Sequence, residues 1–82
     1  MSETEIVNKL GLDAFKKIFE LCVYVGKSET ELESLTGLNS RDIAEDLKIL
    51  EGLQAIQLSG GKWVATPLGK RVWVRYFAEA PG

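Results

Sequence analysis

The chain contains no histidine and only one cysteine among its 82 residues. A single cysteine cannot form an intramolecular disulfide, and without histidine no structural zinc site of Cys/His ligands can be assembled. Histidine is also the side chain most often used for proton transfer near neutral pH, and neither a Gly-x-Ser-x-Gly motif nor a phosphate-binding loop is present. We therefore expect a protein that is not an enzyme and that uses no metal and no cofactor.

Long apolar runs are missing as well. The longest, residues 21–25, is far below the roughly 18 residues needed to cross a bilayer. The first five residues, Met-Ser-Glu-Thr-Glu, contain two acidic side chains and no basic one, whereas a secretory signal begins with basic residues and continues into an apolar stretch. These features predict a cytoplasmic protein with no membrane partner.

The length and composition predict one small globular domain. Eighty-two residues have room for a single hydrophobic core, and a content of 45% hydrophobic and 27% charged residues is typical of a folded, soluble chain. The expected unit is therefore the whole of residues 1–82.

Two helices are predicted in the first third of the chain. Residues 2–5, Ser-Glu-Thr-Glu, have the capping-box pattern and predict a short helix that ends near Leu10. Asp13 is the predicted cap of a second helix, which ends at Gly26. Its apolar side chains recur at spacings of three and four: Phe15, Ile18, Phe19, Cys22 and Val25. Because Cys22 lies on this stripe, we expect a buried thiol and not a reactive one.

Residues 30–51 predict two short helices joined by a tight turn. A second capping box, Thr-Glu-Leu-Glu, starts at Thr30, and Gly37 is suited to the left-handed turn that closes such a helix. Ser40 is the predicted cap of the next helix, which runs from Arg41 to about residue 50. Its core-facing side chains are Ile43, Leu47 and Leu50. Two helices across a turn of about three residues form a helix-turn-helix.

Residues 53–78 predict a β-hairpin and a last helix. Residues 53–58 are mostly apolar with two glutamines, residues 59–62 (Ser-Gly-Gly-Lys) supply the turn, and residues 63–66 form the return strand. Pro67 suits the first position of the last helix, residues 68 to about 78, because no amide partner is needed there. The predicted fold class is therefore mainly α with a small β-hairpin (α+β).

The segment from Thr30 to Leu53 resembles the helix-turn-helix of small prokaryotic winged-helix regulators. Its Thr-Gly-Leu at residues 36–38 is similar to the turn of that family, and its Gly-Leu at residues 52–53 comes one or two residues earlier than usual. Residues 62–70, Lys-Trp-Val-Ala-Thr-Pro-Leu-Gly-Lys, resemble the second strand of the family's wing and the Thr-x-x-Gly-Lys/Arg that opens its last helix.

This resemblance covers about residues 12–75 and implies a winged helix-turn-helix. Such a domain has a three-helix core, a two-stranded wing (here about residues 53–66) and a C-terminal helix (about residues 67–78). The implied function is sequence-specific binding of double-stranded DNA as a transcriptional regulator. The second helix of the helix-turn-helix would enter the major groove, and the wing would lie on the backbone.

The resemblance also points to DNA-contacting residues. By position, the base-facing candidates are Asn39, Ser40, Arg41, Ala44, Glu45 and Lys48. Arg41 is the strongest candidate because a guanidinium can pair with both acceptors of guanine, although it could instead pair with Glu45 four residues on. Lys62, beside two glycines, is the candidate for a phosphate contact, with an ordinary hairpin lysine as the alternative.

The charge of the same segment favours a different function. From Arg41 to Glu51 there are two basic and four acidic side chains, and the whole chain has a net charge of −2. This is unusual for a helix that enters a DNA groove. The alternative is a protein–protein interaction module, a subunit or adaptor of a larger complex with little or no DNA binding, and an exposed Ile49 would fit it.

The last helix is apolar on more sides than one core contact requires. Leu68, Val72 and Tyr76 form one apolar stripe that can anchor the helix on the core. Trp73, Val74 and Phe77, which lie outside this stripe, are apolar too. This predicts a second covered surface, for which we expect a homodimer. The expected dimer interface consists of Trp73, Phe77, Ile6 and Leu10. The alternatives are that Trp73 and Phe77 pack on the first helix of their own chain, or that a different protein binds here.

Overall fold

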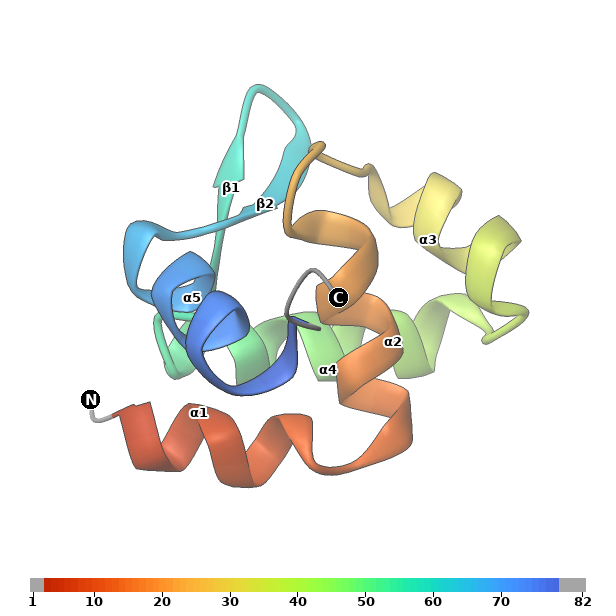
Figure 1. The fold of residues 1–82 in the computed structure, drawn as a ribbon. Helices are drawn as coiled ribbons and strands as arrows, with labels where there is room; N and C mark the ends of the chain where they lie inside the picture. The colour runs from red at the N-terminus through yellow and green to blue at the C-terminus, as the bar shows by residue number, and fades with distance from the viewer. Residues whose placement is uncertain (1–2, 79–82) are drawn as a thin grey trace.

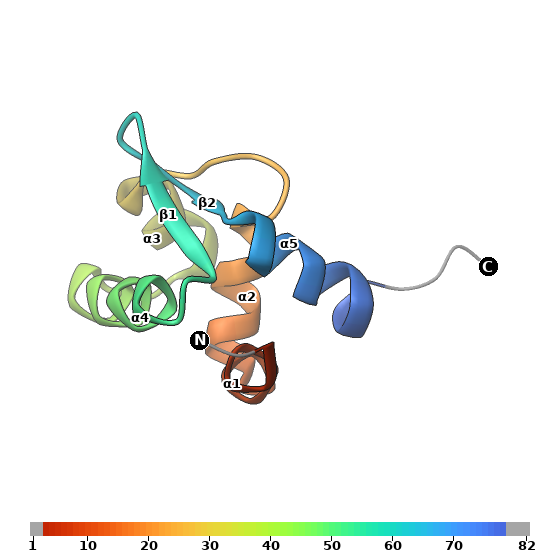
Figure 2. The same cartoon turned by 90° about the vertical axis from the view of Figure 1, so that its left-hand side faces the viewer.

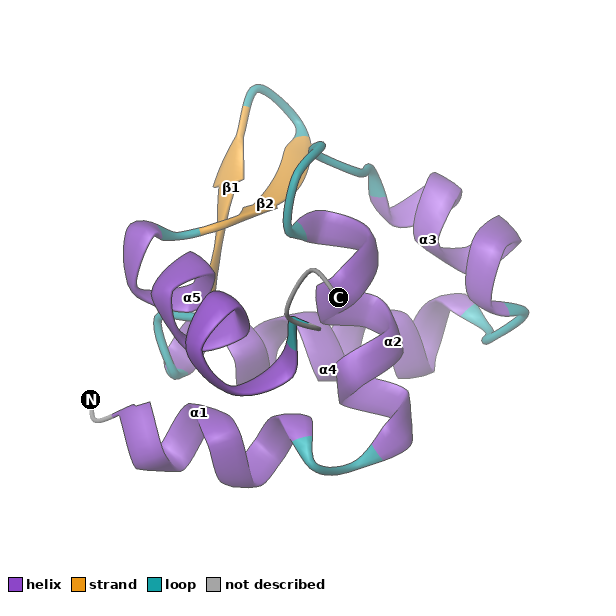
Figure 3. Ribbon diagram, viewed as in Figure 1, coloured by secondary structure: helices purple, strands orange, loops and turns teal. Residues whose placement is uncertain are grey.

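The computed structural model describes residues 3–78. Its helices are α1 (Glu3–Leu10), α2 (Asp13–Cys22), α3 (Glu29–Thr36), α4 (Ser40–Gly52) and α5 (Pro67–Val72). A π-helical turn, η1 (Trp73–Phe77), follows α5 directly, and we call the two together the terminal helix. Two antiparallel strands, β1 (Ile56–Ser59) and β2 (Lys62–Ala65), form a hairpin (Figure 3). The α+β class predicted from the sequence is confirmed.

The helix α2 lies at the centre of the fold (Figure 1) and contacts α1, α3 and β2. In Figure 2, α3, α4 and the tip of the hairpin lie on one side of α2, and the terminal helix extends from the other side. Phe19 of α2 is fully buried, and its ring centroid is 5.8 Å from that of Trp73 in η1. One hydrophobic core therefore joins the two sides of the molecule.

The helix α1 ends at Leu10, as predicted, but the predicted caps of the first two helices are not confirmed. Ser2, the predicted cap of α1, lies outside the described residues. Asp13 is the first helical residue of α2 and not its cap. The cap position is Leu12, whose apolar side chain accepts no hydrogen bond.

The helix α2 ends at Cys22 and not at Gly26, because the chain must leave the helix to pair with β2. The Lys27 amide donates to the Trp63 carbonyl at 2.9 Å, and the Trp63 amide donates to the Lys27 carbonyl at 2.7 Å. Residues 23–26 form a bent connection to this bridge. Val25, predicted on the buried stripe, is consequently exposed. Cys22 is fully buried, as predicted.

Both helices of the predicted helix-turn-helix begin earlier than the sequence indicated. Ser28 caps α3 through a reciprocal capping box with Glu31, so Thr30 lies inside the helix. Two overlapping Ser/Thr-x-x-Glu patterns exist in this segment, and the bridge at Lys27 selects the first because the helix starts directly after the extended residues. Asn39, not Ser40, caps α4.

Left-handed residues close α3 and α4. Gly37 ends α3 with a φ of 75°, as predicted. The helix α4 continues to Gly52, beyond the predicted end near residue 50, and the left-handed residue after it is Gln54 with a φ of 62°. The Gln54 amide donates to Glu51 and the Ala55 amide donates to Leu50, which is the Schellman pattern of a helix end. The strand predicted from residue 53 therefore starts only at Ile56.

The hairpin turns at two glycines, as predicted. Gly60 and Gly61 have φ values of 59° and 79°, and the strands pair in a register that sets Ile56 opposite Ala65. The terminal helix starts as predicted, with Pro67 in its first turn and the Thr66 hydroxyl accepting from the Gly69 amide at 2.9 Å. Its helical structure ends at Phe77, one residue before the predicted end.

Candidate nucleic-acid interface

The helix α4 has a buried side and a polar outer side. Ile43, Leu47 and Leu50 are buried in the core. With about 3.6 residues per turn, the opposite side of the helix carries Arg41, Glu45 and Lys48, all of them exposed. We call these three residues the outer face of α4, and it carries two positive charges and one negative charge.

The Arg41 side chain is 87% exposed, compared with 67% for Glu45. Its Nε lies 4.0 Å from Oε1 of Glu45, so the pairing considered as an alternative is present. An exposed ion pair of this kind contributes little to stability because both charges remain solvated. A phosphate or a guanine edge can therefore replace Glu45 at little cost.

The other predicted base-facing residues differ in availability. The Asn39 side chain is engaged, because its carboxamide oxygen accepts from the Asp42 amide at 2.9 Å. Ser40 is exposed in the first turn of α4, and Ala44 is half-buried. The structure thus leaves Ser40, Arg41 and the rest of the outer face accessible and commits Asn39 to the helix cap.

The remaining acidic residues of α4 lie away from its outer face. Asp46 is half-buried, and its pKa is raised by burial and by the nearby carboxylates of Asp42 and Glu45, while Lys9 of α1 acts in the opposite direction. Asp46 therefore lies on a partly buried flank of α4. Glu51 lies on the other flank, beside the hairpin. Two of the four acidic residues are therefore not on the outer face.

Lys62 lies at the start of β2, and its ammonium group is directed toward α3. Nζ of Lys62 is 3.7 Å from Oε1 of Glu31, the capping-box acid. The pKa of Glu31 is lowered mainly by the hydrogen bond from the Ser28 amide and further by Lys62. The hairpin lysine is thus engaged in an exposed ion pair with α3.

A negative charge dominates α3 and α4 taken together. Residues 29–52 contain seven acidic side chains and only two basic ones. The acidic residues are Glu29, Glu31, Glu33, Asp42, Glu45, Asp46 and Glu51. Most of the chain's positive charge therefore lies on other elements.

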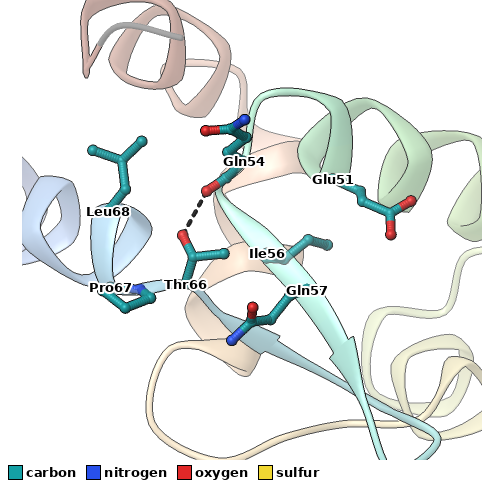
Figure 4. Close-up of a pocket in the computed structure, with 7 residues that line it drawn as sticks. All are labelled: Glu51, Gln54, Ile56, Gln57, Thr66, Pro67 and Leu68. Carbon is teal, nitrogen blue, oxygen red and sulfur yellow. Dashed lines mark hydrogen bonds between the residues drawn. The ribbon is translucent and has the colours of Figure 1, made fainter.

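An open cleft of about 380 Å³ lies between the end of α4, β1 and the start of α5 (Figure 4). It is lined by Glu51, Gln54, Ile56, Gln57, Thr66, Pro67 and Leu68. The Thr66 hydroxyl donates a hydrogen bond to the Gln54 carbonyl across it. Sequence reasoning missed this cleft because two separate stretches, residues 51–57 and 66–68, form it and no local motif marks it.

Three of the four residues predicted for a dimer interface belong to the chain's own core. Ile6 and Leu10 are fully buried, and Trp73 is 7% exposed. Phe77 is half-buried and stacks on Trp73, with ring centroids 5.7 Å apart. Trp73 therefore packs within its own chain, against Phe19 of α2 and against Phe77, whereas the alternative considered from the sequence was packing on the first helix.

The described part of the chain has neither a cluster of metal-ligating side chains nor a membrane-spanning helix. Among residues 3–78, no group of three or more acidic, cysteine or histidine side chains is arranged to hold a metal ion. Within the same residues, no helix is long and apolar enough to cross a membrane.

Comparison of this chain with protein-family models, with curated proteins and with solved structures returns no match.

Proposed function

We propose that this chain is a winged helix-turn-helix domain that binds double-stranded DNA sequence-specifically as a transcriptional regulator. The order of elements supports this proposal: α2 is followed by α3, a three-residue connection, α4, the hairpin and the terminal helix. This order is similar to that of the small prokaryotic regulators that the sequence resembles. In this proposal, α4 enters the major groove and the hairpin is the wing.

The observation that carries the proposal is the composition of the outer face of α4. Arg41 and Lys48 are exposed there, whereas Asp46 and Glu51 lie on the flanks beside other elements. The face presented to a groove is therefore more positive than the helix as a whole. A bidentate pair between Arg41 and guanine would contribute about 1–3 kcal/mol of discrimination against other bases.

The hairpin would contact the phosphate backbone through Lys62. Its ion pair with Glu31 is exposed, so the ammonium group can exchange that carboxylate for a phosphate. The proposal concerns a single copy of the domain, because the core of that copy already uses most of the side chains predicted for dimerisation.

Fluorescence anisotropy with a selected duplex tests the proposal. A site is first enriched from a randomised duplex pool, and affinity is then measured at about 50 and 200 mM salt, where several phosphate contacts predict a loss of orders of magnitude. Arg41→Ala should relax the preference at one base position, and Lys62→Ala should weaken all sequences alike. Lys17→Ala, which removes an equal charge from an exposed site on α2, is the matched control.

The absence of any binding at about 50 mM salt would refute DNA binding. Unchanged affinity and unchanged base preference in Arg41→Ala would show that α4 does not read bases, even if the protein binds DNA by other means.

The acidic surface supports a second candidate function, a protein-interaction module. Seven acidic side chains against two basic ones in residues 29–52, together with an exposed Ile49, would suit a basic protein partner. Glu45→Gln separates the two functions. It should strengthen binding to DNA, because it removes a negative charge that the phosphates repel. It should weaken binding to a basic partner, because it removes a negative charge that such a partner attracts.

A further inference from the structure

The terminal helix carries positive charge with no acid of its own. Residues 67–78 include Lys70, Arg71 and Arg75 and contain no aspartate or glutamate. All three basic side chains are exposed in the structure. Val74 and Tyr76 beside them are also exposed, at 64% and 52%. This composition is the opposite of that of α3 and α4.

Two of these cations have no counter-charge within the described chain. Arg75 donates to Glu3 of α1 at 3.2 Å. Lys70 and Arg71, in contrast, make no side-chain hydrogen bond or ion pair within residues 3–78. Lys16 of α2 lies close to the same helix, since its Nζ is 5.9 Å from the centroid of the Phe77 ring. We call Lys70 and Arg71 the terminal basic face.

We infer that the terminal basic face binds the phosphate backbone of a nucleic acid. Exposed cations without internal partners can neutralise phosphates without first breaking an ion pair. Lys70 and Arg71 are neighbours in the helix, and one strand of a duplex presents a phosphate about every 3.4 Å of axial length. The pair can therefore contact two neighbouring phosphates of one strand.

A membrane surface fits these residues less well. An interfacial helix buries a broad apolar face among the lipids, whereas Val74 and Tyr76 are the only large apolar side chains that the terminal helix leaves more than half exposed among the described residues. The aromatic rings of Trp73 and Phe77 are already stacked on each other against the core.

The terminal helix, which carries Lys70 and Arg71, lies on the opposite side of α2 from α4 (Figure 2). One duplex in contact with the outer face of α4 therefore leaves the terminal basic face free for a second duplex segment. This consequence rests on the proposed function of α4, but phosphate binding by the terminal helix does not. With both surfaces occupied, one molecule would bridge two segments of DNA.

Anisotropy with a labelled random-sequence duplex of about 30 base pairs tests the inference. The variant Lys70→Gln/Arg71→Gln should lower the slope of log affinity against log salt by about 2, since each lost phosphate contact removes about 0.9. Lys17→Glu is the control, because it changes the net charge by the same two units at an exposed site of α2. Thermal melting of all proteins by circular dichroism verifies that each variant is folded.

A bead assay tests the bridging. Wild-type protein should retain a second, free duplex on beads that carry the first duplex, whereas Lys70→Gln/Arg71→Gln should bind the first duplex and fail to retain the second. If Arg41→Ala leaves the affinity and base preference for the selected duplex unchanged while the terminal double variant loses random-sequence binding, the inference stands and the proposal for α4 fails.

Three results would overturn the inference. The first is a double variant with the affinity and salt slope of Lys17→Glu. The second is binding of the wild type to vesicles of phosphatidylserine with no binding to duplex. The third is self-association of the protein in sedimentation that depends on salt and is lost in the double variant, without any binding of DNA. The terminal basic face would then bind the acidic surface of a second copy.

Discussion

Gly69 is the position at which one added methyl group should do the most damage. It is buried in the terminal helix, and a Cβ there would overlap the carbonyl oxygen of Ala55 and lie 3.1 Å from Cε1 of Phe19. The Ala55 carbonyl cannot easily withdraw, because it accepts a hydrogen bond from the Thr66 amide at 3.0 Å. Thr66 is in turn the cap of α5. The clash therefore falls on backbone that also fixes the start of the helix.

The size of the effect follows from the cost of overpacking. Forcing an extra methyl group into a packed core costs about 1–3 kcal/mol, and contact with hydrogen-bonded backbone places Gly69→Ala at the upper end, about 2–3 kcal/mol. A domain of this length has a stability of about 4–12 kcal/mol. The midpoint of thermal unfolding should consequently fall by about 10–20 °C.

Gly52→Ala is the matched control. Gly52 is also helical, but a Cβ at this position would meet nothing within 4 Å. The substitution should leave stability unchanged or raise it by up to about 1 kcal/mol, since glycine loses more conformational freedom than alanine in a helix.

Urea unfolding followed by tryptophan fluorescence measures both variants, because Trp63 and Trp73 are buried in the folded chain. The urea midpoints of the two variants should differ, whereas the slopes of free energy against urea concentration should agree. A Gly69→Ala protein within about 0.5 kcal/mol of the wild type would refute the close approach of the terminal helix to Ala55.

Two further predictions concern the end of α4 and the buried thiol. Gln54→Gly should stabilise the protein by about 1 kcal/mol, because Gln54 holds a φ of 62° that glycine adopts without strain; an unchanged urea midpoint would contradict the left-handed helix end. Burial raises the pKa of Cys22 from 9.0 to about 11, with Lys27 lowering it to a smaller extent. The unfolded thiol ionises first, so the stability due to Cys22 is complete below about pH 9 and is lost as the pH rises toward 11. Wild type should therefore lose more stability than Cys22→Ala over this range in urea titrations, and parallel curves would show that the thiol is not shielded.

Local signals in the sequence determined much of the architecture. Gly37 closes α3 and the two hairpin glycines take positive φ, because at these places the backbone conformation itself selects the residue. Ile43, Leu47 and Leu50 recur at helical spacing and all lie in the core. Such features depend on near neighbours along the chain, and they were predictable for that reason.

Helix ends depended on contacts between distant segments. Serine and threonine patterns at residues 28 and 30 both fit a capping box, and the pairing of Lys27 with Trp63 decided between them. The same bridge ended α2 at Cys22. At the end of α4, the Schellman hydrogen bonds selected Gln54 over the glycine two residues earlier as the left-handed residue.

In the candidate interface too, some features follow from the local sequence and others from contacts between distant segments. The sequence by itself determined the number of acidic and basic side chains in α4, and it determined that the terminal helix carries three cations and no acid. Only the tertiary structure decided that Asp46 is half-buried, that Lys62 pairs with Glu31, and that Trp73 belongs to the core of its own chain. The direction in which a side chain points is set by the elements packed around its helix, and the packing of separate elements is not written in any local stretch of sequence.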